Sequence, residues 1–200
     1  MADHYYSRSP ETASDPMYWN AELRNHQFRF KTDQGVFSKK EVDFGSRLLI
    51  DTFELPDKAG PILDVGCGYG PIGLSLAKDF PERHLHMVDV NQRAIALARE
   101  NAGLNMIDNV DIYESDRFEE IKETNFAAVL TNPPIRAGKD IVHDILEKSF
   151  QHIIPGGDLW VVIQKKQGAP SAKAKMAEVF DRVEIIAKKK GYYILKASKY

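Results

Sequence analysis

From Pro61 to the end of the chain, short apolar runs typical of β-strands alternate with segments whose apolar residues recur at helical spacing. Such alternation is typical of βαβ units, which build a mostly parallel sheet with helices on both faces. The last two runs flank a turn near Gly191 and predict an antiparallel hairpin at the sheet edge. The sequence therefore predicts an α/β fold with a seven-stranded sheet. The expected strands are residues 61–65, 84–90, 110–114, 127–131, 159–164, 182–187 and 192–197, and the expected helices are 71–79, 91–103, 139–152 and one that contains 172–180.

The N-terminal part of the chain is polar and aromatic without a clear period. We expect residues 1–34 to form an extension that packs on a domain spanning residues 35–200, with a short strand at residues 27–32. Ser38 and Glu41 fit a capping box, in which each side chain satisfies a backbone N–H near the other residue. This pattern predicts a helix from about residue 39 to residue 53.

Composition narrows the class of protein. With 200 residues, of which 43% are hydrophobic and 28% charged, the chain is expected to fold as one soluble domain. No apolar run approaches the roughly 20 residues of a membrane helix, and no signal peptide is expected because the first residues contain no apolar core. The single cysteine, Cys67, cannot form an internal disulfide, which fits a reducing compartment. These features predict a cytoplasmic enzyme or binding domain without a membrane partner.

Charge is unevenly distributed along the chain. The formal net charge is −2, yet residues 161–200 carry ten Lys or Arg against three Asp or Glu. A basic edge of this kind can bind phosphates, whereas a solvated lysine face is the simpler alternative. The acidic balance of the whole chain argues against a protein that coats nucleic acid without selectivity.

A glycine-rich turn follows the predicted strand 61–65 and precedes a predicted helix. Gly66, Gly68 and Gly70 allow a sharp turn and let a ligand lie against the backbone. The helix N-terminus offers free N–H groups and a partial positive charge, which suit a carboxylate or a phosphate. The spacing Gly68-x-Gly70-x-x-Gly73 also matches the dinucleotide-binding fingerprint, a weak signal when it stands alone.

Acidic residues close the neighbouring strands. Asp89 ends the next strand, where a carboxylate can accept hydrogen bonds from both ribose hydroxyls of NAD or of S-adenosylmethionine; the alternative is a charge that favours the following helix. Asp64 lies at the end of the first strand and suits a cationic amino group, which S-adenosylmethionine has. Ser115 and Asp116 follow the third strand, and Asp116 could accept from an adenine amino group or be a solvated loop acid.

The segment Asn132-Pro133-Pro134-Ile135 follows the fourth strand and should reach the same sheet edge. An exocyclic amino nitrogen is a poor nucleophile because its lone pair is delocalised. The Asn132 side-chain oxygen and the Pro133 carbonyl could accept its two N–H groups and aim the lone pair at an incoming methyl group, which is catalysis by positioning. Proline restricts the backbone around it and so fixes that carbonyl. The alternative is a Pro-Pro loop that merely ends a strand.

These motifs together resemble the S-adenosylmethionine-dependent methyltransferases of the Rossmann-like class over residues 35–200. The residues that carry this resemblance are Asp64-x-Gly66-x-Gly68-x-Gly70, Asp89, Asp116 and Asn132-Pro133-Pro134. More narrowly, the chain resembles the guanine-N2 methyltransferases of small-subunit ribosomal RNA, the methyltransferase C family. The narrower resemblance rests on Gly35-Val-Phe-Ser38, Asp43-Phe-Gly45-Ser46 and the Asn-Pro-Pro segment.

The resemblance implies a cofactor and a role for each motif. S-adenosylmethionine is the expected cofactor, with its methionine part on the glycines, its ribose on Asp89, its adenine near Asp116, and Phe37-Ser38 covering it. Asn132 and Pro133 are expected on the target amino group. The expected cofactor-binding residues are Phe37, Ser38, Asp64, Gly66, Cys67, Gly68, Gly70, Asp89, Val90, Ser115, Asp116 and Asn132, and the expected catalytic residues are Asn132, Pro133, Pro134 and Ile135.

Two departures from the family concern the substrate. The better-known members carry a second, degenerate methyltransferase domain, where this chain has only residues 1–34 before its domain. The residue after the two prolines is often aromatic in amino methyltransferases and can stack on a flipped base, whereas here it is Ile135. Phe30, Phe37 or Tyr69 could supply a stacking face instead, and the alternative for each is a core residue. Phosphates of an RNA substrate are expected near Arg136, Lys139, Lys165 and Lys166.

The favoured hypothesis is a methyltransferase acting on guanine N2 of 16S ribosomal RNA, with the RNA or the small ribosomal subunit as its partner. Adenine N6 and a protein glutamine amide are alternatives within the same chemistry, because the motif reads only an N–H₂ group. A non-catalytic module that binds RNA or a partner, and a nicotinamide oxidoreductase, are alternatives outside it. The histidines show no metal-ligand spacing and Cys67 has no partner cysteine, so no metal site is expected.

Overall fold

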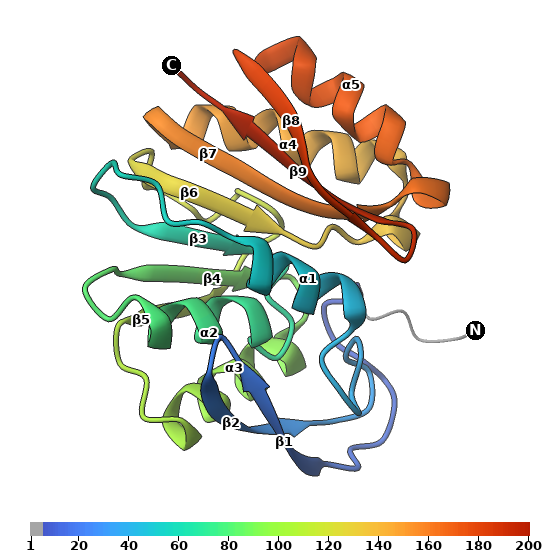
Figure 1. The fold of residues 1–200 in the computed structure, drawn as a ribbon. Coiled ribbons are helices and arrows are strands. Elements are labelled where there is room, and N and C mark those ends of the chain that lie inside the picture. Colours follow the sequence, from blue (N-terminus) through green and yellow to red (C-terminus); the bar gives the residue numbers. More distant parts are fainter. Residues whose placement is uncertain (1–5) are drawn as a thin grey trace.

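A computed structural model describes residues 6–200. Its centre is one seven-stranded sheet in the order β5-β4-β3-β6-β7-β9-β8 (Figure 1). The first five of these strands run parallel, and β9 pairs antiparallel with both β7 and β8. The predicted sheet with its C-terminal antiparallel hairpin is thereby confirmed. The strands are β3 (Ile62–Val65), β4 (Leu85–Asp89), β5 (Val110–Glu114), β6 (Phe126–Thr131), β7 (Ile153–Gln164), β8 (Arg182–Lys189) and β9 (Tyr192–Ser198).

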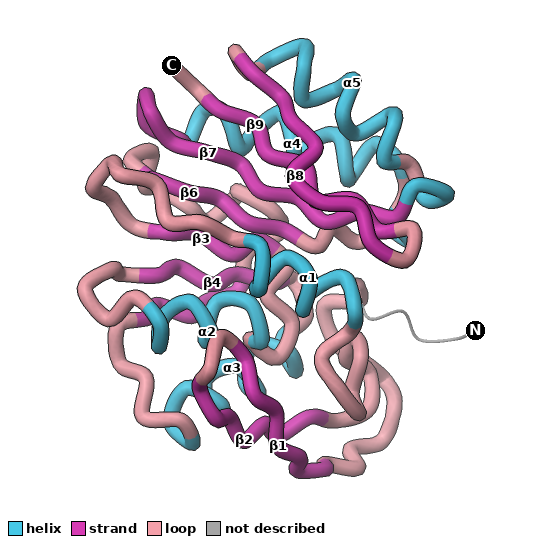
Figure 2. The backbone as a smooth tube through the Cα atoms, viewed as in Figure 1, coloured by secondary structure: helices cyan, strands magenta, loops and turns pink. Residues whose placement is uncertain are grey.

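Helices cover both faces of the sheet. Alternate residues of a strand point to opposite faces, so the apolar strands present side chains that must be buried on each side. On β3, Ile62 packs in the cluster beneath the first three helices, whereas Leu63 packs in the cluster beneath the last two. Figure 2 shows α4 and α5 on the side of the sheet away from α1. The helices are α1 (Phe44–Thr52), α2 (Pro71–Asp79), α3 (Gln92–Leu104), α4 (Lys139–His152) and α5 (Ala169–Val179). None of the helices in the described part of the chain is long and apolar enough to cross a membrane.

A separate antiparallel hairpin, β1 (Met17–Leu23) and β2 (His26–Thr32), packs on α3. Asn101 of α3 and Asn105, the C-cap of that helix, bind the free edge of the hairpin. The Asn101 side chain accepts the N–H of Lys31 and donates to its carbonyl, at 2.7 and 3.0 Å, and Asn105 does the same with Arg29 at 2.9 Å each. The strand predicted at 27–32 is confirmed, but its partner β1 was missed, although Met17, Trp19, Ala21 and Leu23 form the apolar alternation of a half-buried strand.

The start of α1 differs from the prediction. Asp43, not Ser38, caps the helix, and its carboxylate accepts the backbone N–H of Ser46 at 3.0 Å. Ser38 lies in the left-handed region, with φ of 52°, and its hydroxyl donates to the carbonyl of Glu41. The capping-box prediction is therefore wrong: residues 37–40 form turns, and the local hydrogen bond of Ser38 favours a turn over a helix.

β7 also begins earlier than predicted. The sequence Pro155-Gly156-Gly157 is typical of a turn, but these residues continue the strand as an irregularity in its pairing with β6. The N–H of Gly156 donates to the carbonyl of Lys199 at 2.6 Å, so this segment pairs with the end of the chain. Such a bulge is one of the few places where a sheet accepts proline and glycine.

Candidate active site

A cavity of about 350 Å³ opens at the carboxyl ends of the parallel strands. This volume lies within the usual range for small-molecule sites, and the sheet edge is where ligands bind in such folds. The cavity collects residues from the ends of β3, β4, β5 and β6 and from the start of β9. Most of the predicted site residues line it, namely Phe37, Ser38, Gly66, Cys67, Gly68, Asp89, Val90, Ser115, Asn132, Pro133, Pro134, Ile135 and Arg136.

The glycine turn forms one wall of this cavity. Gly66 and Gly68 have φ angles of 75° and 58°, in the left-handed region, and a Cβ on either would meet nothing within 4 Å. Their lack of side chains therefore leaves open space for a ligand beside the backbone. Gly73 has a different role, because a Cβ there would lie 2.7 Å from Met87. The turn is thus open toward the cavity and closely packed behind it.

Asp89 is fixed beside the turn. Its carboxylate accepts the N–H of Gly68 at 2.8 Å and the N–H of Asn91 at 2.8 Å. Burial raises the pKa of Asp89, and these backbone N–H groups counteract the shift. The carboxylate joins the glycine turn to the start of α3 and keeps acceptor capacity toward the cavity, as its predicted contact with ribose hydroxyls requires.

Asp64 lies beneath the turn and does not line the cavity. One carboxylate oxygen accepts the N–H of Gly73 at 2.9 Å, and the other, although buried, has no partner among the described residues. Burial raises the pKa of Asp64 to about 7, and the nearby Asp89 adds to the shift. In the structure this acid stabilises the first turn of α2. Its contact with the amino group of a ligand stays a prediction.

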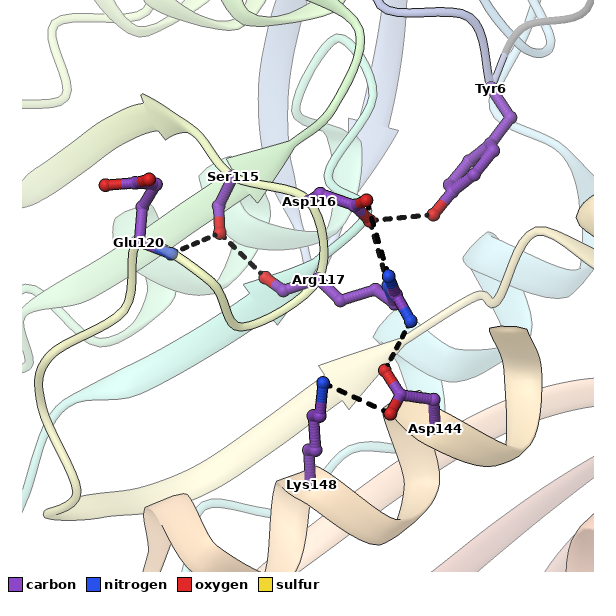
Figure 3. A network of polar contacts seen from close by, with 7 residues as sticks. All are labelled: Tyr6, Ser115, Asp116, Arg117, Glu120, Asp144 and Lys148. Carbon is purple, nitrogen blue, oxygen red and sulfur yellow. Dashed lines mark hydrogen bonds and ion pairs between the residues drawn. The ribbon is translucent and has the colours of Figure 1, made fainter. Parts of the chain in front are cut away.

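Asp116 belongs to a polar network that reaches the N-terminal segment (Figure 3). Its carboxylate accepts the Tyr6 hydroxyl at 3.1 Å and Nε of Arg117 at 2.9 Å, and Arg117 also binds Asp144 at 2.6 Å. The guanidinium of Arg117 lowers the pKa of Asp116. The contact between Asp116 and adenine stays a prediction. Tyr6 and Arg117, which the sequence did not indicate, line the cavity where Asp116 does not.

The Asn-Pro-Pro segment is held from two sides. The Thr131 hydroxyl donates to the carbonyl of Val65 at 2.9 Å and ties the end of β6 to the end of β3. The Asn132 side-chain N–H₂ donates to the Ser46 hydroxyl at 3.0 Å and to the Asp43 carboxylate at 3.4 Å. In the sequence, Asp43 and Ser46 indicate only a resemblance to a family, and their contact with Asn132 was not predicted.

The predicted phosphate contacts divide into two groups. Arg136 lines the cavity from a short 3₁₀ turn, Ile135–Ala137. Lys139 instead lines a smaller neighbouring cavity of about 180 Å³. Lys165 and Lys166 are exposed on a second 3₁₀ turn, next to Gln164 and Gln167, which do line the main cavity. The lysines therefore lie around the cavity rather than in it.

The aromatic residues also differ from expectation. Phe30 is fully buried against Trp19 and Tyr69, so its proposed stacking role is wrong. Tyr69 borders the cavity but is only 2% exposed, whereas Phe37 borders it and is 46% exposed. Tyr192 of β9 also lines the cavity and was missed. No local pattern marks Tyr192, because it reaches the cavity only through the pairing of β9 with β7.

One group of metal-ligand residue types lies close together in the described part of the chain, and the expectation of no metal site stays a prediction. His84, His86 and Asp111 place one ligand atom each within 4.8 Å of one another. They lie at the opposite end of β4 from the cavity. His84 is hydrogen-bonded to Asp111 at 2.8 Å, and His86 to the Tyr113 hydroxyl at 3.1 Å.

Comparison with known proteins places the chain in a family. A family model described as the methyltransferase small domain matches residues 27–196. An uncharacterized protein of Bacillus subtilis (strain 168), YbxB, is 61% identical over 200 residues, which is 100% of both chains. The ribosomal RNA small subunit methyltransferase C of Vibrio cholerae is 31% identical over 182 residues, 89% of this chain and 52% of that protein. This chain thus spans about half the length of the methyltransferase C relatives that it matches.

Solved structures show the same fold. A T. thermophilus 16S rRNA N2 methyltransferase, in complex with AdoMet and guanosine, has a TM-score of 0.83 and 23% identity, covering 96% of this chain and 52% of that one. A methyltransferase from Pyrococcus furiosus has a TM-score of 0.67 and 22% identity, covering 82% and 89% of the two chains. The open glycine wall and the fixed Asp89 suit the cofactor that the sequence predicted. The chain belongs to the methyltransferase small domain family and is an S-adenosylmethionine-dependent methyltransferase.

Proposed function

We propose that this methyltransferase acts on an exocyclic amino nitrogen of ribosomal RNA, namely guanine N2 of 16S ribosomal RNA. The observation that carries the proposal is the arrangement of the cavity. Asn132 and Pro133 line the same space as Gly66, Gly68 and Asp89, so a target amine and the cofactor can meet there. The similarity to the Vibrio cholerae enzyme named for small-subunit ribosomal RNA supports the choice of substrate.

The chemistry of this step needs orientation rather than a strong base. S-adenosylmethionine supplies an already activated methyl group. The Asn132 side-chain oxygen and the Pro133 carbonyl accept the two N–H groups of the target amine and hold its lone pair in one direction. The nitrogen forms a bond to the methyl carbon as the carbon–sulfur bond breaks, and one N–H proton then leaves to water.

The cofactor contacts within this function are also proposals. Phe37 and Ser38 cover the ligand from one side, and Tyr6 with Arg117 borders it from another. Asp89 accepts from the ribose hydroxyls, so Asp89→Ala should weaken cofactor binding. A binding isotherm equal to that of the unchanged protein would remove this role from Asp89.

Contact with RNA is assigned to the basic residues around the cavity. Arg136 lines the cavity, and Lys139, Lys165 and Lys166 are exposed beside it. Phosphate contacts of this type position a substrate without reading its sequence. Residues 1–34 are proposed to serve as an extension on a catalytic domain of residues 35–200.

Methyl transfer from labelled S-adenosylmethionine tests the proposal. The substrates are naked ribosomal RNA and small ribosomal subunits from cells that lack this protein, with DNA and a protein extract alongside. Label recovered as N2-methylguanosine after nucleoside digestion is the expected result. Label in N6-methyladenosine or in protein would move the substrate to one of the alternatives. Cofactor binding without transfer to any of these would favour a binding module and contradict the proposal.

A further inference from the structure

The catalytic amide of Asn132 is bound on one side only. Its N–H₂ group donates to the Ser46 hydroxyl at 3.0 Å and to a carboxylate oxygen of Asp43 at 3.4 Å. In the described part of the chain no donor occupies its side-chain oxygen. That oxygen is not among the buried polar atoms without a partner, and Asn132 lines the cavity.

The Asp43 carboxylate determines which way the amide is turned, because it can only accept, whereas the Ser46 hydroxyl can accept or donate. An amide has two N–H donors on one atom and an acceptor oxygen on the other. Rotating the Asn132 amide by half a turn would place its oxygen against the Asp43 carboxylate, and two acceptors would then face each other. The unrotated form keeps both hydrogen bonds and leaves the oxygen for a ligand. The rotated form would instead present an N–H₂ group to the N–H₂ group of the substrate.

The two acceptors stand on a rigid element. Asp43 is the N-cap of α1, and the carboxylate oxygen that faces Asn132 also accepts the N–H of Ser46 at 3.0 Å. Leu49 and Ile50 of the same helix are fully buried in the core. Gly45 lets the ring of Tyr192 lie against this first turn, because a Cβ there would be 2.7 Å from that ring. The turn is therefore fixed to the sheet, as a precise site requires.

We propose that Asp43 and Ser46 are positioning residues that hold the Asn132 side-chain oxygen toward the target amine. The proposal rests on the proposed function, because it assigns the orientation of the residue that binds that amine. Neither residue takes part in the transfer itself. Their loss should lower the rate of the chemical step and leave cofactor affinity unchanged.

Ser46→Ala is the sharpest variant for this test. It removes the nearer acceptor of Asn132 but keeps the backbone N–H that Asp43 caps, and alanine is the best helix former. Asp43→Asn is a second variant, since asparagine is an equally good N-cap but lacks the negative charge. Ser149→Ala is the matched control. Ser149 of α4 is also a buried helical serine, but it does not line the cavity, and its hydroxyl donates to a backbone carbonyl one turn earlier in its own helix, that of Ile145.

Kinetics on the labelled RNA substrate give the first readout. Ser46→Ala should lower kcat by about tenfold or more, since small misplacements in an active site have large effects, with the Kd for S-adenosylmethionine unchanged. In an Asn132→Ala background the same change should have no further effect, because its partner is gone. Losses that multiply in the double variant, or a Kd that rises with the kcat loss, would overturn the proposal.

A second readout needs no substrate and separates this proposal from the proposed function. The Asn132 side-chain N–H₂ signals are identified by ¹⁵N NMR of the full chain through their loss in Asn132→Ala. Ser46→Ala should shift these signals and speed their exchange with water, whereas Ser149→Ala should leave them in place. Unchanged Asn132 signals in Ser46→Ala would overturn the proposal. Altered signals, together with no transfer to RNA by the unchanged protein, would support the positioning role and reject the proposed substrate.

Discussion

At the scale of single residues, two carboxylates of the site, Asp89 and Asp64, differ in how their oxygens are hydrogen-bonded. Asp89 borders the cavity and is fixed by two backbone N–H groups. Asp64 is buried beneath it with one oxygen paired to Gly73 and the other unpaired. An unpaired buried carboxylate oxygen is unfavourable when the group is charged and less so when it is protonated. Asp64 therefore links the stability of the glycine turn to pH.

The free energy of unfolding should depend on pH through the titration of Asp64. Burial raises its folded-state pKa to about 7, whereas an unfolded aspartate titrates near 4. Between these values the folded state binds the extra proton, so this contribution to stability is present at low pH and is lost as pH rises to 7. Asp64→Asn cannot titrate. Urea unfolding should show the variant gaining stability relative to the unchanged protein from pH 5 to pH 7, by up to about 1.4 kcal/mol per pH unit, with no further gain above pH 7. Parallel pH profiles would contradict this assignment.

At the scale of elements, two segments outside the central sheet complete the molecule. The β1–β2 hairpin has no sheet neighbour at its β2 edge and pairs instead with the side chains of Asn101 and Asn105. Residues 6–12 lie beside the cavity, where the N–H of Gln92 donates to the carbonyl of Arg8 and Arg93 donates to that of Thr12. Both segments are held by polar contacts from α3.

The hairpin should depend on Asn101. This side chain is fully buried and binds both the N–H and the carbonyl of Lys31, as well as the carbonyl of Tyr69. Asn101→Ala would leave these buried groups without partners, at a cost of about 1–3 kcal/mol in the free energy of unfolding. Chemical denaturation measures this loss. Gln27→Ala, which removes an exposed contact with Glu22 in the same hairpin, is the control and should change stability little.

The N-terminal segment should contribute to cofactor binding. Tyr6 lines the cavity and donates to Asp116. Tyr6→Ala removes both that wall and that hydrogen bond, so the Kd for S-adenosylmethionine measured by calorimetry should rise several-fold. Tyr18→Ala changes an exposed tyrosine of β1 outside the cavity and should leave the Kd unchanged. Equal affinities in all three proteins would show that the segment only packs beside the site.

At the scale of the whole molecule, the sequence predicted the features that depend on local patterns, namely the sheet and the motifs at the ends of its strands. The βαβ alternation gave the sheet, and the position of each motif at a strand end brought Gly66, Asp89 and Asn132 to one cavity. Contacts between distant segments could not be predicted, because Tyr6 and Tyr192 reach the cavity only after the chain has folded. The start of α1 was also missed, since Ser38 and Asp43 are both suitable N-cap residues, and the hydrogen bond of Ser38 to the carbonyl of Glu41 favours a turn there.

The central claim is that this cavity methylates an exocyclic amine of 16S ribosomal RNA through Asn132. Mass spectrometry of nucleosides from 16S ribosomal RNA tests it most directly, in cells that lack the protein and in cells complemented with the unchanged protein or with Asn132→Ala. One N2-methylguanosine should be missing without the protein and should return with the unchanged protein. It should not return with Asn132→Ala, although that variant still binds S-adenosylmethionine. An N2-methylguanosine content equal in all three cell lines would contradict the central claim.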